Sequence, residues 1–197
     1  MSSIIITLSN KNKGENRMKK QIRKGVFETN SSSTHAICIA TEDVLNIPNK
    51  IHFEFGDYEW ECRKLVSMQD RVNYLYTALT YINDINTITK YLTFIANTLK
   101  AHGVEDIEFD SFELSFYEWE GVINAYAAPL EKDSDEWYGI DHGRETREFV
   151  DAVCTDEDRL LHYLFSNKSY IETGNDNDEY DVNINVDYPH EEYYKGN

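Results

Sequence analysis

The sequence predicts an α+β fold in a single domain, in which an antiparallel pair of helices and further C-terminal helices pack on a mixed β-sheet. Two observations lead to this class. Of the 197 residues, 41% are hydrophobic, which provides enough apolar side chain for one substantial core. Segments with the two-residue period of strands alternate with segments that have the helical period. No internal repeat or linker is evident, so residues 18–197 are predicted as one domain with an acidic C-terminal tail.

Short strands are predicted on both sides of a polar segment near the N-terminus, at residues 22–27 and 35–40. Residues 51–55 alternate apolar and polar side chains, which is typical of a half-buried strand. Residues 107–116 alternate in the same way, with one slip in the frame, and residues 169–173 form a further expected strand. Together these segments supply the predicted sheet.

Two helices are predicted in the middle of the chain. Apolar residues recur every three or four positions over 68–82 and again over 88–99. A capping-box pattern at 67–70 favours a helix start there, and the short break between the two periodic segments predicts an antiparallel pair. Helical patterns return at 145–153 and after the capping segment Thr-Asp-Glu-Asp at 155–158.

Residues 1–17 are expected to be a non-native or disordered extension outside the domain. Lys13, Gly14 and Glu15 can be encoded by a sequence that contains a bacterial ribosome-binding site. Such a site would lie at a suitable distance before Met18, and Met18-Lys-Lys is a plausible bacterial start. A genuine but disordered N-terminus is the alternative.

The charge balance is strongly acidic, with 36 Asp and Glu against 19 Lys and Arg and a formal net charge of −17. This excludes a broad basic surface for nucleic acid, because neutralising phosphates requires clustered Lys and Arg. An acidic surface can instead attract a basic protein that normally holds DNA or RNA. Solubility alone is the alternative explanation of the charge.

The apolar pattern and the cysteines indicate a compartment. No run of 18 apolar residues predicts a membrane span, and no signal peptide is recognisable. The three cysteines are widely spaced and form no C-x-x-C pair, which favours a reducing environment over a disulfide framework. We therefore expect a cytoplasmic protein.

Polar residues from three parts of the chain are candidates for a shared pocket. A hydroxyl-rich segment precedes His35, while His142 follows Asp141 in a turn bracketed by glycines. An Asp can orient a His for acid–base chemistry near neutral pH. The predicted catalytic residues are His35, His142 and Asp141. The predicted ligand-binding residues are Glu28, Asn30, Ser31, Ser32, Ser33, Thr34, Asn175 and Asp176.

Such a pocket suits metal-independent cleavage of RNA, in which one histidine removes a 2′-hydroxyl proton and the other protonates the leaving oxygen. On this hypothesis, His35→Ala abolishes function with little change in melting temperature. Two alternatives stay open: a structural histidine beside a strand, and a polar linker. The acidic turns at 133–135 and 175–178 lack the Gly and Glu of calcium loops, and no nucleotide-binding motif is present. We expect no metal and no cofactor.

One resemblance adds to this interpretation, and it begins at the segment RKGVFETNSSSTH of residues 23–35. The segment resembles the N-terminal signature of small uncharacterised acidic proteins in phages and mobile elements of Gram-positive bacteria. Residues 140–142 and 169–177 are similar to later segments of those proteins. The resemblance implies a phage or prophage setting, and with it the cytoplasm of a bacterial host cell, but no activity. Small acidic proteins in that setting often antagonise host defence, as type II-A anti-CRISPR proteins do.

Two classes of function therefore remain. The first is an inhibitor whose acidic face occupies the nucleic-acid channel of a basic host-defence protein, such as a CRISPR effector nuclease with its guide RNA. The second is a metal-independent ribonuclease or nucleotide-processing enzyme that uses the polar pocket. The inhibitor requires acidic residues on one contiguous face, whereas the enzyme requires His35 and His142 close together.

Overall fold

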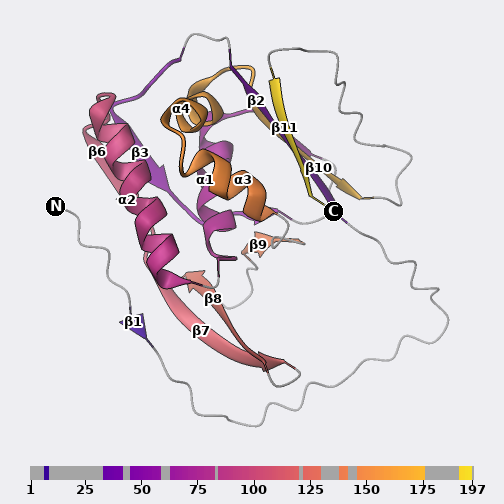
Figure 1. Ribbon diagram of the computed structural model, residues 1–197. Helices are drawn as coiled ribbons and strands as arrows, with labels where there is room; N and C mark the ends of the chain where they lie inside the picture. Colours follow the sequence, from indigo (N-terminus) through magenta and orange to yellow (C-terminus); the bar gives the residue numbers. More distant parts are fainter. Residues whose placement is uncertain are drawn as a thin grey trace.

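Eleven strands and four helices make up the described part of the chain in the computed structural model shown in Figure 1. The described residues are 7–8, 33–41, 45–58, 63–82, 84–119, 122–129, 138–141, 146–175 and 191–196. The sheets include both parallel and antiparallel pairs, and the helices lie between and beside them. The predicted α+β class is confirmed. The strand predicted at 22–27 lies outside the described residues.

A four-stranded antiparallel sheet has the order β11-β2-β10-β5. Its strands are β2 (Ser33–Ala40), β5 (Arg63–Leu65), β10 (Tyr170–Asn175) and β11 (Glu191–Gly196). Ile37, Ile39 and Ile171 from its central strands belong to the hydrophobic core, where α4 contacts β2. The edge strand β11 falls within the segment that was expected as an acidic tail, so part of that segment completes the sheet.

The other strands form three smaller sheets rather than joining one mixed sheet. β3 (Lys50–Phe53) pairs in parallel with β6 (Asp106–Phe109), and β4 (Asp57–Tyr58) pairs in parallel with β9 (Gly139–Ile140). β7 (Phe112–Trp119) and β8 (Val122–Pro129) form a hairpin, and β1 (Thr7–Leu8) pairs in parallel with β7. The slip in the pattern of 107–116 corresponds to the break between β6 and β7. That residues 1–17 form an extension stays a prediction.

Three of the four described helices begin at a side chain that accepts a hydrogen bond from a backbone N–H group in the first turn. The four helices are α1 (Met68–Leu79), α2 (Ile85–Ala101), α3 (Arg147–Val153) and α4 (Glu157–Phe165). Helix α3 is the exception. Ser67 caps α1 by accepting from the N–H of Asp70 at 3.0 Å, as the capping pattern predicted. Asp84 caps α2 and Asp156 caps α4. None of the four, all within the described ranges, has the length and apolar character needed to cross a membrane.

Helix α1 is the centre of the fold. From Arg71 onward every residue of α1 except Asn73 is buried. It contacts β3 and β9 as well as α3 and α4, and Figure 1 shows it between the β3–β6 pair and the four-stranded sheet. Its tyrosines Tyr74 and Tyr76 pack against the rings of Tyr58, Phe149, Phe53, Phe55 and Phe109. A helix surrounded in this way joins both halves of the core.

One buried cation, Arg71, connects α1 to the C-terminal end of α4. Its side chain is almost fully buried, and its two terminal nitrogens donate four hydrogen bonds to backbone carbonyls. These carbonyls belong to Val66, Leu164, Ser166 and Ser169. Burial lowers the pKa of the guanidinium, and the nearby Tyr163 and Asp70 act in the opposite direction. Carbonyl dipoles therefore provide most of its solvation.

The thiols of Cys38 and Cys154 are both buried. Burial raises the pKa of the Cys154 thiol, and the nearby Asp151 raises it further. Because the thiolate is the reactive form, we expect neither cysteine to be alkylated by iodoacetamide in the native protein at mildly alkaline pH. Both should react in concentrated urea. Mass spectrometry of labelled peptides measures this, and rapid native labelling of Cys154 would contradict the buried position.

Candidate functional site

His35 lies on β2 with its side chain turned into the core. The residue is 4% exposed, and its Nδ1 lies 3.1 Å from the hydroxyl of Tyr74. The two rings are 5.9 Å apart between centroids. Ile37 and Ile39 follow on the same face of the strand, because side chains two residues apart share a face. His35 is therefore part of the set of side chains that β2 contributes to the core.

The register of β2 and β10 brings together two of the three polar segments predicted to converge. Ser33 pairs with Asn175, Thr34 with Gly174, and His35 with Thr173. The backbones of the hydroxyl-rich segment and of the later segment thus run side by side at this end of the sheet. His142 lies outside the described residues. So do the remaining predicted ligand-binding residues, which are Glu28, Asn30, Ser31, Ser32 and Asp176. The shared pocket stays a prediction.

Asp141, from the third segment, is linked to His35 through two tyrosines. Its backbone N–H donates to the carbonyl of Tyr58 at 3.0 Å. The ring of Tyr58 meets that of Tyr74 edge-on, with centroids 4.9 Å apart, and Tyr74 contacts His35. Burial raises the pKa of both tyrosine hydroxyls, so both stay neutral. The region between the two predicted catalytic residues therefore contains neutral aromatic side chains.

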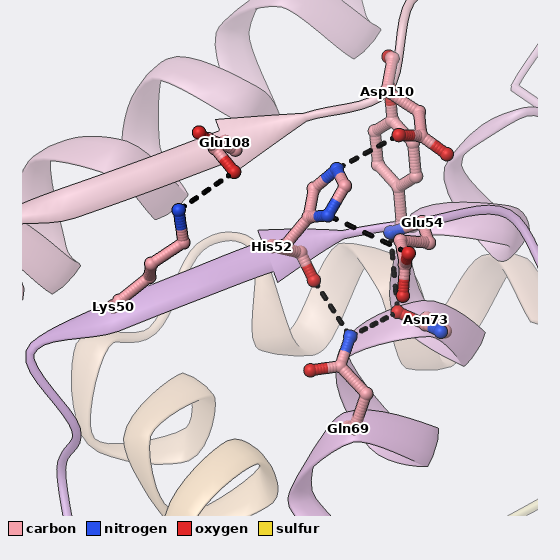
Figure 2. Close-up of polar contacts among 8 residues, drawn as sticks. Lys50, His52, Glu54, Gln69, Asn73, Glu108 and Asp110 are labelled. Carbon is pink, nitrogen blue, oxygen red and sulfur yellow. Dashed lines mark hydrogen bonds and ion pairs between the residues drawn. The ribbon is translucent and has the colours of Figure 1, made fainter.

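A second group of polar side chains lies on the outward face of the β3–β6 pair (Figure 2). We call it the charged face. It consists of Lys50, His52 and Glu54 from β3 and its end, and Asp106, Glu108 and Asp110 from β6 and its end. These side chains are between 37% and 56% exposed. Four carboxylates thus share one solvent-facing surface with one lysine and one histidine.

The charges on this face are arranged in contact with one another. The Nζ of Lys50 lies 3.0 Å from Asp106 and 3.1 Å from Glu108. The Nε2 of His52 lies 2.9 Å from Oδ1 of Asp110, and its Nδ1 lies 3.6 Å from Oε1 of Glu54. Exposed ion pairs contribute little to stability, typically about 0–1 kcal/mol. Their main consequence here is a defined pattern of charge on a surface.

Helix α1 bonds the edge of β3 that faces away from β6 with three polar side chains, which we call the α1 ladder: Gln69, Asn73 and Thr77. The Nε2 of Gln69 donates to the carbonyl of His52 at 2.8 Å. The N–H groups of Glu54 and Gly56 donate to Asn73 and Thr77, at 3.2 and 2.9 Å. Residues four apart on a helix rise about 6 Å, close to the roughly 6.6 Å between alternate strand residues. The ladder therefore covers an edge that would otherwise be unpaired.

Sequence reasoning did not identify the charged face as a site. The alternation in 51–55 places His52 and Glu54 on the polar side of a strand, and this was the available signal. The acidic partners come from a strand more than fifty residues later, and nothing local in the sequence indicates that β6 pairs with β3. Within the described ranges, no group of three or more His, Cys, Asp or Glu side chains is arranged to hold a metal ion.

Comparison of the chain with protein-family models, curated proteins and solved structures found no significant match.

Proposed function

We propose that this protein is a phage- or prophage-encoded antagonist of host defence that binds a basic, nucleic-acid-handling protein in the bacterial cytoplasm. A CRISPR effector nuclease with its guide RNA is an example of such a partner. The observation that carries the proposal is the formal net charge of −17, together with a surface on which carboxylates gather. The phage-like polar segment supports the setting.

The physical basis is competition for the same cationic side chains. Proteins that hold nucleic acid present Arg and Lys to phosphates, and carboxylates pair with these groups in similar geometry. The charged face offers four carboxylates and only one lysine. The net negative charge of the whole molecule also steers a basic partner toward it and increases the association rate.

The enzyme hypothesis receives less support. A general base must come within hydrogen-bond reach of the proton that it removes. His35 is almost fully buried and contacts Tyr74, which favours a structural role. The inhibitor is therefore the function that we propose.

The association should depend strongly on salt. We expect the association rate constant with a captured partner to fall markedly between low and physiological ionic strength, because salt screens exposed charges. The dissociation rate should change much less. Surface plasmon resonance over a salt series measures both. A salt-independent association rate would contradict a mechanism based on the acidic surface.

The partner can be identified by capture from a host lysate on the immobilised protein, with mass spectrometry of bound proteins and sequencing of bound RNA. We expect a basic protein with nucleic-acid-binding activity, and loss of that activity when this protein is added to it. Capture of acidic or purely metabolic proteins, with no nucleic-acid-binding protein among them, would contradict the proposal.

A further inference from the structure

Strand β6 has one edge that pairs with β3 and one that faces away from it. The N–H of Asp106 donates to the carbonyl of Asn49 at 3.0 Å, and the N–H of Asp110 donates to that of Phe53 at 2.9 Å. Backbone groups of successive residues point to opposite edges of a strand. The N–H and C=O groups of Ile107 and Phe109 therefore point away from β3.

Within the described part of the chain, β3 is the only strand that pairs with β6. Figure 1 shows β6 at the outside of the molecule, with β3 on its inner side. The two edges of the pair thus differ. The α1 ladder covers the edge of β3. Among the described residues, no strand lies beside the far edge of β6. An uncovered edge is a template for pairing with another extended segment.

The side chains next to this edge select what can pair with it. Asp106 and Glu108 stand on the charged face of β6, both about half exposed. A second copy of this chain, with its net charge of −17, would be repelled. Lys50 of the neighbouring strand shows what fits, because its ammonium bridges Asp106 and Glu108 from the β3 side. A lysine or arginine on a strand at the other edge would meet the same two carboxylates.

We propose that the outer edge of β6 takes an extended basic segment of the partner protein as an added strand. The inference rests on the proposed function and specifies how the partner is held. Main-chain hydrogen bonds to Ile107 and Phe109 supply affinity, and basic side chains at alternate positions of the segment supply specificity. The partner segment should therefore carry Lys or Arg at every second residue.

The test uses a synthetic peptide that alternates lysine with threonine, and a control peptide with the same side chains but N-methyl groups on alternate backbone nitrogens. The control keeps the charge and cannot pair as a strand. We expect it to bind the protein about tenfold more weakly, as the loss of one or two main-chain hydrogen bonds implies. Amide exchange measured by NMR should show new protection at Ile107 and Phe109. Asp106 and Asp110, already bonded to β3, should change little.

Two charge reversals locate the site. Glu108→Lys should reduce the affinity for the lysine peptide at least as much as N-methylation does. Glu148→Lys, on an exposed position of α3, changes the net charge equally and should leave the affinity nearly unchanged. Circular dichroism verifies that both variants fold. Equal binding of the two peptides, protection elsewhere, or no binding of either peptide would overturn strand addition. Equal binding would leave the proposed acidic inhibitor standing, whereas salt-independent capture would refute the inhibitor itself.

Discussion

Replacing Arg71 with methionine is expected to lower the free energy of unfolding by about 3–5 kcal/mol. Methionine fills much of the same volume but donates no hydrogen bond. Four buried or half-buried carbonyls then lose a donor that lies 2.7 to 2.9 Å away in the native protein. Urea denaturation followed by circular dichroism measures the effect, which should appear as a lower midpoint with an unchanged slope.

The size of this effect follows from where the carbonyls lie. Leu164 is in the last turn of α4 and Ser166 is its C-terminal cap, where carbonyls have no helical donor and the helix dipole is negative. A cation bonded there donates hydrogen bonds to these carbonyls and also compensates the negative end of the helix dipole. Arg71→Lys should give an intermediate loss, because a single ammonium cannot reproduce the planar arrangement of two terminal nitrogens.

Arg147→Met is the matched control for this experiment. Arg147 lies on the surface of α3 and pairs with Asp151, four residues later. Exposed pairs of this kind contribute little, so the free energy of unfolding should change by no more than about 0.5 kcal/mol. If the two methionine variants are equally stable, Arg71 does not hold the C-terminal end of α4 and the residue before β10 to α1 as its contacts indicate.

The second large effect is expected at His35. His35→Ala removes a buried imidazole, leaves a cavity beside Tyr74 and takes a partner from the Tyr74 hydroxyl. We expect a loss of about 2–3 kcal/mol in the free energy of unfolding. The hypothesis of a catalytic His35 predicted little change in melting temperature, so thermal unfolding distinguishes the two roles.

A double-mutant cycle separates the hydrogen bond from the packing. Tyr74→Phe removes only the hydroxyl, and its effect combined with His35→Ala should be less than additive by about 1 kcal/mol. His162→Ala is a suitable control, because its Nδ1 bonds the carbonyl of Asp158 one helical turn earlier in an exposed contact on α4. That variant should lose about 0.5 kcal/mol or less. Additive effects at positions 35 and 74 would contradict the coupling.

The helices were predictable because their signals are local. The apolar period and the cap at Ser67 both lie within one segment, so α1 was located to within a few residues of its observed end. Six of the described strands were not predicted: β1, β4, β5, β8, β9 and β11. β11 reads Glu-Glu-Tyr-Tyr-Lys-Gly, with no alternating apolar pattern, and it is a strand because β2 pairs with it. Strand formation depends on such distant partners, which a single sequence does not reveal.

The same reason explains the prediction at His35. The hydroxyl-rich residues before it suggested a pocket, yet His35 has the same spacing as Ile37 and Ile39, which indicates the core face of the strand. This spacing was visible in the sequence, but the hydroxyl-rich residues before His35 were given more weight. The link between His35 and Tyr74 joins residues 39 positions apart and could not be inferred. His52 and Asp110 are a comparable case, since their contact requires the pairing of β3 with β6.

The α1 ladder also determines which residues of β3 face the solvent. If β3 slipped by one residue along α1, the side chains of Ile51 and Phe53 would replace those of His52 and Glu54 on the outside. Three uncharged side chains at fixed intervals on the helix oppose that slip, because each bonds a particular backbone atom of the strand. An insertion or deletion of one residue between His52 and Gly56 would break this match, because the bonded backbone atoms belong to every second residue. The α1 ladder therefore fixes the number of residues between His52 and Gly56, and with it the side chains that form the charged face.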